Sequence, residues 1–148
     1  MEILPAKLDD VPVLAQLLGV LFAQEHDFYP DPELQVLGLT LIIENPSIGL
    51  ILVAKEQGTI VGMVNLLFSV STALGAKVAT LEDMVVLPEW RDQGIGSQII
   101  QRAIEEARRQ GCARITLLTD TTNEPAHRFY GRHGFKPSAM TPLRLKLD

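Results

Sequence analysis

The sequence predicts a single mixed α/β (α+β) domain over residues 1–148. Two observations carry this prediction: β-rich segments fill the middle of the chain, and segments with apolar residues at helical spacing lie before and after them. The chain has 148 residues, 47% of them hydrophobic, which suffices for one hydrophobic core and is short for two. We therefore expect a central sheet flanked by about four helices.

Two helices are expected before the main strands, after a short strand at residues 3–7. The first begins at Asp9 or Asp10 and has Pro12 in its first turn. Its apolar residues form one stripe: Val13, Leu14, Leu17, Leu18 and Leu21. The second helix begins at Asp31 and ends where Asn45 and Pro46 interrupt the pattern.

Strands dominate the middle of the chain. Segments 50–55 and 60–70 are β-rich, and a hairpin turn suits residues 57–59 between them. Segment 77–87 follows as a third strand, which Pro88 ends because proline has no amide hydrogen to donate.

The last third of the chain continues the alternation. The clearest helix spans 94–110, with apolar and charged residues on opposite faces. After it we expect a strand at 113–119, a short helix at 124–133, and a closing strand at 143–147 with residues 135–137 beside it.

Composition narrows the classes of partner. Thirteen Lys and Arg against eighteen Asp and Glu give a formal net charge of −5, so no general attraction to nucleic acid or anionic lipid is expected. The N-terminus lacks a basic segment followed by an apolar one, and other apolar runs are too short to cross a bilayer. We expect a cytoplasmic protein with no nucleic-acid or membrane partner.

Cysteine and histidine give no sign of a metal site. Cys112 is the only cysteine, which excludes an internal disulfide, and a small buried side chain is its ordinary role. His127 and His133 lack metal-ligand spacing with a second His or a Cys. We therefore expect no metal.

The segment that joins the third strand to the clearest helix is the best candidate for a binding site. The first amides of a helix lack intrahelical acceptors, and the helix dipole favours an anion there. Gly94 and Gly96 leave the backbone bare, and Arg91 can add a charged donor. The spacing fits neither a dinucleotide fingerprint, since Ile99 replaces the third glycine, nor a P-loop. A helix start without a ligand is the alternative.

Two motifs resemble those of the GNAT superfamily of N-acetyltransferases. The first is the strand, the proline and the pattern Arg-x-x-Gly-x-Gly at residues 91–96, followed by the amphipathic helix. The second runs from Asn123 to Phe135, with an Asn, then an Ala, then a Tyr, and a helix end at Gly-Phe. The likeness is specific from about Leu81 to Phe135 and looser over the rest of the chain.

The resemblance implies a mixed, mostly antiparallel sheet that is splayed in its middle, where the pantetheine arm of acetyl-CoA enters. The residues that would contact acetyl-CoA lie on the third strand, on the glycine-containing loop and on the short second-motif helix. They are Met84, Val85, Val86, Arg91, Asp92, Gln93, Gly94, Ile95, Gly96, Ser97, Asn123 and Tyr130. Asp92 departs from the family's usual small or basic residue, and an N-cap role would turn its carboxylate away from the phosphates.

The implied reaction needs a base, because an amine attacks a thioester only when neutral, and a lysine-like amine with a pKa of about 10.4 is protonated at pH 7. Glu82 and Asp83 stand on the strand that leads to the loop. Since strand side chains alternate between faces, only one of them can face the site unless a bulge intervenes. We favour Glu82, with Asp83 and a water relay as alternatives.

Tyr130 matches the family's tyrosine and is the candidate acid for the departing CoA thiolate; packing beside Phe129 is the alternative. By the same likeness Phe28 and Tyr29, near His26, would line the acceptor pocket.

No plausible acylated nucleophile is present, so we expect direct acetyl transfer to a primary amine of a small molecule or peptide in a ternary complex. A non-catalytic acyl-CoA sensor or scaffold is the alternative, and an exposed edge near the closing strand could support a homodimer.

Overall fold

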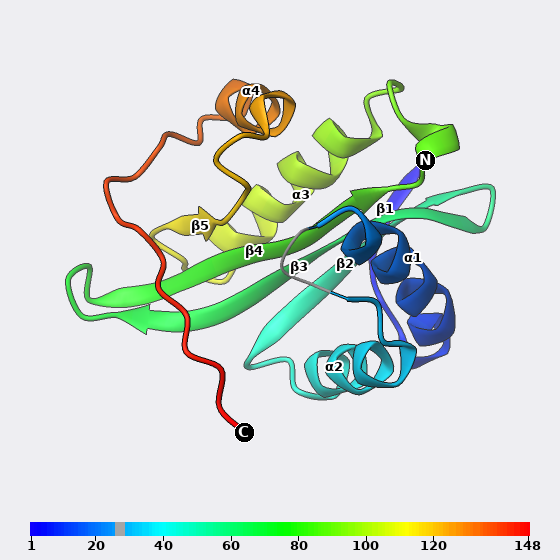
Figure 1. The fold of residues 1–148 in the computed structure, drawn as a ribbon, viewed down its shortest axis with the longest axis horizontal. Helices are drawn as coiled ribbons and strands as arrows, with labels where there is room; N and C mark the ends of the chain where they lie inside the picture. Colours follow the sequence, from blue (N-terminus) through cyan, green and yellow to red (C-terminus); the bar gives the residue numbers. More distant parts are fainter. Residues whose placement is uncertain (26–28) are drawn as a thin grey trace. The chain divides into compact units, whose positions relative to one another are not determined.

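Figure 1 shows the computed structural model, which describes residues 1–25 and 29–148. Residue contacts group the chain into two compact units, Met1–Leu118 and Thr119–Asp148. Among the described residues, the first unit holds the sheet and three α-helices, and the second holds one α-helix. The expectation of a single domain stays a prediction.

A five-stranded sheet with the order β1-β2-β3-β4-β5 forms the centre of the first unit. The strands are β1 (Glu2–Pro5), β2 (Gly49–Glu56), β3 (Thr59–Ser71), β4 (Ala76–Val86) and β5 (Ile115–Leu117). The β1–β2, β2–β3 and β3–β4 pairs are antiparallel, and the β4–β5 pair is parallel. The predicted mixed, mostly antiparallel sheet is thus confirmed.

Local signals set most element ends as expected. Helix α2 (Pro32–Glu44) begins at Asp31, whose carboxylate accepts a hydrogen bond from the Leu34 amide at 3.3 Å. Helix α1 (Val11–Ala23) follows a 3-10 turn, η1 (Leu8–Asp10), and here the Asp10 carboxylate accepts from the Lys7 amide at 2.8 Å instead of capping α1. Helix α3 (Ile95–Arg109) follows a second 3-10 turn, η2 (Pro88–Trp90).

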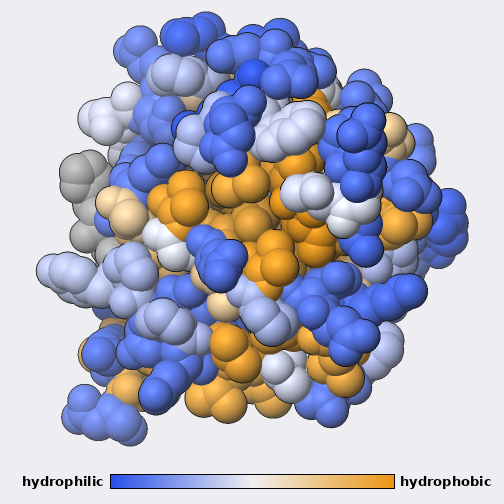
Figure 2. All heavy atoms as spheres, turned by 90° about the vertical axis from the view of Figure 1, so that its right-hand side faces the viewer, coloured by the Kyte–Doolittle hydropathy of each residue, from blue (hydrophilic) through white to orange (hydrophobic). Residues whose placement is uncertain are grey.

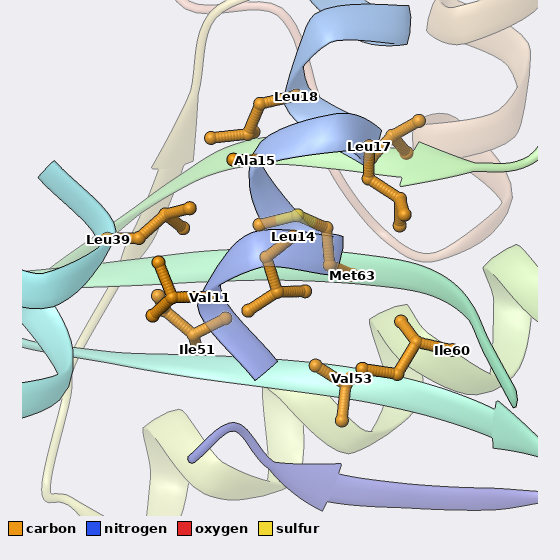
Figure 3. Close-up of a cluster of buried hydrophobic side chains, with 11 residues drawn as sticks. Val11, Leu14, Ala15, Leu17, Leu18, Leu39, Ile51, Val53, Ile60 and Met63 are labelled. Carbon is orange, nitrogen blue, oxygen red and sulfur yellow. The ribbon is translucent and has the colours of Figure 1, made fainter. Parts of the chain in front are cut away.

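Helices cover both faces of the sheet (Figure 1). On one face, side chains from α1, α2 and the sheet form a buried cluster, part of which is labelled in Figure 3: Val11, Leu14, Leu17, Leu39, Ile51, Val53 and Met63. On the other face, α3 buries Ile99, Ile100, Ala103 and Ala107. Adjacent residues of a strand point to opposite faces, and accordingly Met63 joins the first cluster while Ile99 of α3 lies against Gly62.

Some apolar side chains of the first unit remain at the surface. Leu4, Leu8 and Val13 are among the exposed hydrophobic residues. Figure 2 views the side on which Figure 1 shows the N-terminus and α1, and there hydrophobic side chains gather in the middle of the face, with hydrophilic ones around them. Within residues 1–25 and 29–148, no helix combines the length and apolarity needed to cross a membrane.

The second unit contains α4 (Glu124–Arg132), which starts after Asn123 as predicted. The closing strand predicted at 143–147 is wrong, and so is its pairing with residues 135–137, because residues 135–148 form neither helix nor strand. The segment alternates apolar and basic residues, yet Leu143 is 95% exposed, and Leu145 and Leu147 are each 83% exposed. Alternation supplies only side-chain spacing; a strand also needs a hydrogen-bonded neighbour.

Candidate functional site

A β-bulge interrupts β4 between its two functional parts. The register with β3 pairs Asn65 with Glu82 and then Met63 with Val85, so β4 carries one extra residue. Asp83 lies in this irregular stretch and has a left-handed backbone, with φ of 54°. The bulge shifts the side-chain alternation, and the parity argument that favours Glu82 over Asp83 does not apply across it.

Beyond the bulge, β4 has an open edge. β5 pairs with β4 only from Ala79 to Leu81, whereas β4 continues to Val86. The open stretch thus lies next to β5, which is the last strand in the sheet order. The Leu87 amide donates to the Val61 carbonyl at 2.9 Å, so alternation directs the backbone groups of Val86 away from β3, toward the open edge.

The loop after β4 presents backbone at the start of α3. Gly94 is the N-cap residue of α3, with φ of 80°, and a Cβ atom built on it would meet no atom within 4 Å. No side chain within the described residues caps this helix start. The first amides of a helix have no intrahelical acceptor, and this helix start offers them no side-chain cap, which is the arrangement of an anion site.

The side chains of this loop differ in burial and in the contacts that they make. The Arg91 Nε donates to the Val86 carbonyl at 2.9 Å, which ties the guanidinium to the end of β4. Asp92 and Gln93 are exposed, and Asp92 has φ of 63°. The N-cap role considered for Asp92 is wrong: Gly94 takes that position, where a left-handed backbone suits glycine. Ile95 and Val85 are each 3% exposed, so only their backbones can reach a ligand.

Asp83 and Asn65 form a hydrogen-bonded pair on the sheet. The Asn65 Nδ2 donates to the Asp83 Oδ2 at 2.5 Å, and Asn65 is 2% exposed. Burial raises the pKa of the Asp83 carboxyl to about 7, with further increases from the charges of Glu82 and Glu25, while the bond from Asn65 opposes the rise. Glu82, its neighbour, is exposed.

A pocket opens beside this pair. Its volume is about 330 Å³, and its walls come from α1, α2 and the residues just before α2, with Asn65 and Asp83 contributed by the sheet. Tyr29 lines the pocket, as expected of an acceptor-site residue, although its side chain is 90% exposed. Phe28 and His26 lie outside the described residues.

The second unit holds the two remaining predicted residues. The Asn123 side-chain oxygen accepts from the Ala126 amide at 3.2 Å and so caps α4, which leaves the amide NH₂ as the group for a ligand. Tyr130 is half-buried, and its ring packs edge-on against Phe129 at 5.1 Å and Phe135 at 5.7 Å between centroids. The packing alternative considered for Tyr130 therefore holds for its ring, and its hydroxyl role stays a prediction.

The remaining candidates are the cysteine and any group of metal-ligating side chains. Cys112 is half-buried, and burial raises the pKa of its thiol, which disfavours the nucleophilic thiolate. In the part of the chain that the structure describes, no three His, Cys, Asp or Glu side chains gather as a metal site would require.

Asn65 and the α2 wall of the pocket were missed by the sequence analysis. Asn65 stands in a β-rich run and is the only amide side chain between Ile60 and Val70, which could have marked it. Gly38 breaks the apolar helical pattern of α2, and it lines the pocket. Neither Asn65 nor Gly38 indicates in the sequence which residues it lies near, because those residues come from distant segments of the chain.

Comparisons with known proteins agree with this geometry. The model of the acetyltransferase (GNAT) family matches residues 14–135. An aminoalkylphosphonate N-acetyltransferase of Salmonella typhimurium is 39% identical over 85 residues, which cover 57% of this chain and 55% of that protein. An uncharacterized N-acetyltransferase of Bacillus subtilis is 29% identical over 139 residues, covering 92% of this chain and 90% of that protein. The match thus spans about half of the Salmonella protein.

Solved structures share the fold over nearly the whole chain. A probable acetyltransferase is 25% identical with a TM-score of 0.84, covering 100% of this chain and 99% of that one. A predicted acetyltransferase with acetyl-CoA, from Clostridium acetobutylicum, has a TM-score of 0.77 at 17% identity, covers 98% of this chain and 95% of that one, and shows the fold alone. Since the family model covers well over half of the residues, this chain belongs to the GNAT family of acetyltransferases.

Proposed function

We propose that this chain transfers the acetyl group of acetyl-CoA to a primary amine, directly, in a ternary complex. The observation that carries the proposal is the uncapped start of α3 at Gly94, next to the open edge of β4. A diphosphate suits the start of α3, because helix-start amides and the helix dipole favour an anion. An amide-containing arm suits the open edge of β4, because an unpaired strand edge offers backbone donors and acceptors.

The residues around that opening divide the binding of acetyl-CoA between them. Backbone amides from Gln93 to Ser97 would hold the pyrophosphate, with Arg91 adding positive charge. The Val86 amide would serve the pantetheine arm, since the Val86 carbonyl already accepts from Arg91. Asn123 and Tyr130, in the second unit, are proposed as further contacts by the family motif.

We assign the base role to Asp83 in preference to Glu82. A base works best when its pKa lies near the working pH, and the pKa of Asp83 is about 7. Its carboxylate is also fixed by the bond from Asn65 and lines a pocket, whereas Glu82 is exposed. An ionised Asp83 would attract the acceptor's ammonium and take its proton.

The chemistry then balances without a covalent enzyme intermediate. Acetyl-CoA supplies the thioester: the amine nitrogen forms a bond to its carbonyl carbon, and the carbon–sulfur bond breaks. Asp83 takes one proton from the ammonium and later releases it to solvent. The nitrogen loses a second proton as the amide forms, and this proton restores Tyr130, the proposed donor of the proton that the CoA thiolate takes. Products are the N-acetylated amine and CoA.

Calorimetry with acetyl-CoA and assays of CoA release with a panel of amines test the proposal. We expect saturable binding of acetyl-CoA, CoA release that requires both substrates, and lower turnover for Tyr130→Phe at unchanged acetyl-CoA affinity. Absence of acetyl-CoA binding would refute the assignment of the loop. Binding with no transfer to any amine would favour the non-catalytic alternative.

A further inference from the structure

The pocket beside Asp83 has apolar walls. Leu18 and Phe22 of α1 face Leu34, Leu39 and Ile42 of α2 across it. Apolar walls gain most from apolar surface that they remove from water. A hydrophobic group, not a hydrated one, therefore matches this part of the site.

The polar side chains on the α2 side of the pocket are already engaged. The Gln35 Nε2 donates to the Ala15 carbonyl at 2.7 Å, and the Gln35 Oε1 accepts from the Asp31 amide at 2.8 Å. The Asp31 carboxylate accepts from the Leu34 amide at 3.3 Å. A ligand rich in hydroxyl groups would lose its hydration here and find few new partners.

The charge of the pocket has one sign. Asp31 and Asp83 line it, and Glu25 and Glu82 add negative charge near Asp83. Among the described residues that line the pocket, none is Lys, Arg or His. An ammonium is attracted to such a site, and a phosphonate or phosphate is repelled from it.

Size limits the body that the amine carries. The volume of about 330 Å³ lies at the small end of ligand pockets. Gly38 contributes to this space: it lies inside α2, lines the pocket, and leaves nothing within 4 Å of where a Cβ would stand.

Resting on the proposed function, we propose that the acceptor is a primary amine on a small, uncharged, apolar body. The alkyl or aryl body lies between α1 and α2, and the amino group lies at Asp83. This class differs from the substrate named for the Salmonella relative, whose phosphonate has no cationic partner among the described pocket residues. Selectivity is thus a property of the pocket and not of the acetyl-CoA loop.

A matched panel of primary amines tests the class at fixed acetyl-CoA. Phenethylamine and hexylamine represent apolar bodies, 2-aminoethylphosphonate an anionic one, and glucosamine a hydroxylated one. We expect kcat/KM for the apolar amines to exceed that of the other two by about tenfold or more. Equal or better use of 2-aminoethylphosphonate or glucosamine would overturn the inference and leave the proposed function standing.

Two glycine variants localise the effect. Gly38→Leu fills the pocket and should raise KM for phenethylamine by about tenfold, with little change for ethylamine and an unchanged Kd for acetyl-CoA. Gly19→Leu is the control, because Gly19 lies inside α1, has open space at its Cβ position, and does not line the pocket. Equal effects of both variants on phenethylamine would overturn the assignment of the pocket.

Calorimetry of the same amines in the presence of CoA separates the two proposals. Apolar amines that bind the natural chain, bind Gly38→Leu more weakly, and are never acetylated would uphold the pocket and refute the proposed function. Failure of every apolar amine to bind would overturn the inference. Circular dichroism of each variant confirms that its fold is retained.

Discussion

The loop at the start of α3 and the pocket between α1 and α2 are built in different ways. The loop is one continuous segment, residues 91–97, and it offers backbone amides around a glycine without a side chain. The pocket draws on two helices and two strands, and it offers side chains, chiefly apolar ones with Asp83 and Asn65. From this contrast we propose that the loop serves a ligand shared by the family and the pocket a ligand particular to this chain.

The bulge in β4 connects the two regions. Before it, β4 pairs with β5, and beyond it the strand edge opens toward the loop. At the bulge itself, Asp83 bonds to Asn65 and lines the pocket. Variants of Asp83 or Asn65 should affect the pocket, and variants of the loop should affect the binding of acetyl-CoA. The following predictions use this difference.

The largest effect is expected for Asp83→Asn. Loss of a general base should lower kcat by about 10²- to 10⁴-fold at pH 7, with the Kd for acetyl-CoA unchanged. Glu82→Gln, the control on the neighbouring residue, should change kcat by less than about threefold, in line with the small effects of exposed charges. Steady-state kinetics and calorimetry measure both. A greater loss in Glu82→Gln would make Glu82 the base.

The second largest effect also concerns Asp83→Asn, and it is an effect on the pH dependence of the unfolding free energy. The pKa of Asp83 is raised from 3.8 to about 7, so between these values the unfolded chain has released a proton that the folded chain keeps. The unfolding free energy of the natural chain should therefore fall as the pH rises from 3.8 to about 7, by about 4 kcal/mol in all from this group.

Asp83→Asn removes that dependence, so denaturant unfolding at pH 5 and pH 8 should show a smaller loss for it than for the natural chain. Asp92→Asn, in the exposed loop, is the control and should behave like the natural chain. Parallel pH dependence in all three proteins would contradict the buried, protonated state of Asp83.

The loop is tested by a charge change at constant backbone geometry. Gly94→Asp places a carboxylate where the diphosphate is proposed to bind, in a left-handed conformation that Asp tolerates. We expect the Kd for acetyl-CoA to rise by about tenfold or more, with the KM for the amine little changed. Gly111→Asp, with φ of 82° at the other end of α3, makes the same change away from the loop and should bind normally.

The smallest effect is expected for Asn65→Leu. The bond from Asn65 favours ionised Asp83, so its loss should raise the pKa of Asp83 and move the acidic limb of the kcat/KM profile upward by about one pH unit. A role limited to packing would lower activity without moving that midpoint. A pH profile of kcat/KM, with the natural chain beside the variant, distinguishes the two.

Prediction from sequence succeeded where the cause is local. Asp31 caps α2, the turn at Gln57 and Gly58 joins β2 to β3, and Gly94 starts α3, each through interactions within a few residues. Prediction failed where contacts with residues distant in the sequence decide the structure. The alternating segment 143–147 forms no strand.

The sequence by itself determined the helix starts, the β-rich centre and the glycine-containing loop before α3, because capping, turn formation and helix-start amides depend on neighbouring residues. Only the tertiary structure decided which acidic residue is buried and what surrounds it. Burial of Asp83 arises from a bulge relative to β3 and from two helices contributed by earlier parts of the chain. A pKa depends on the dielectric and the charges around the group, and chain order does not specify these surroundings.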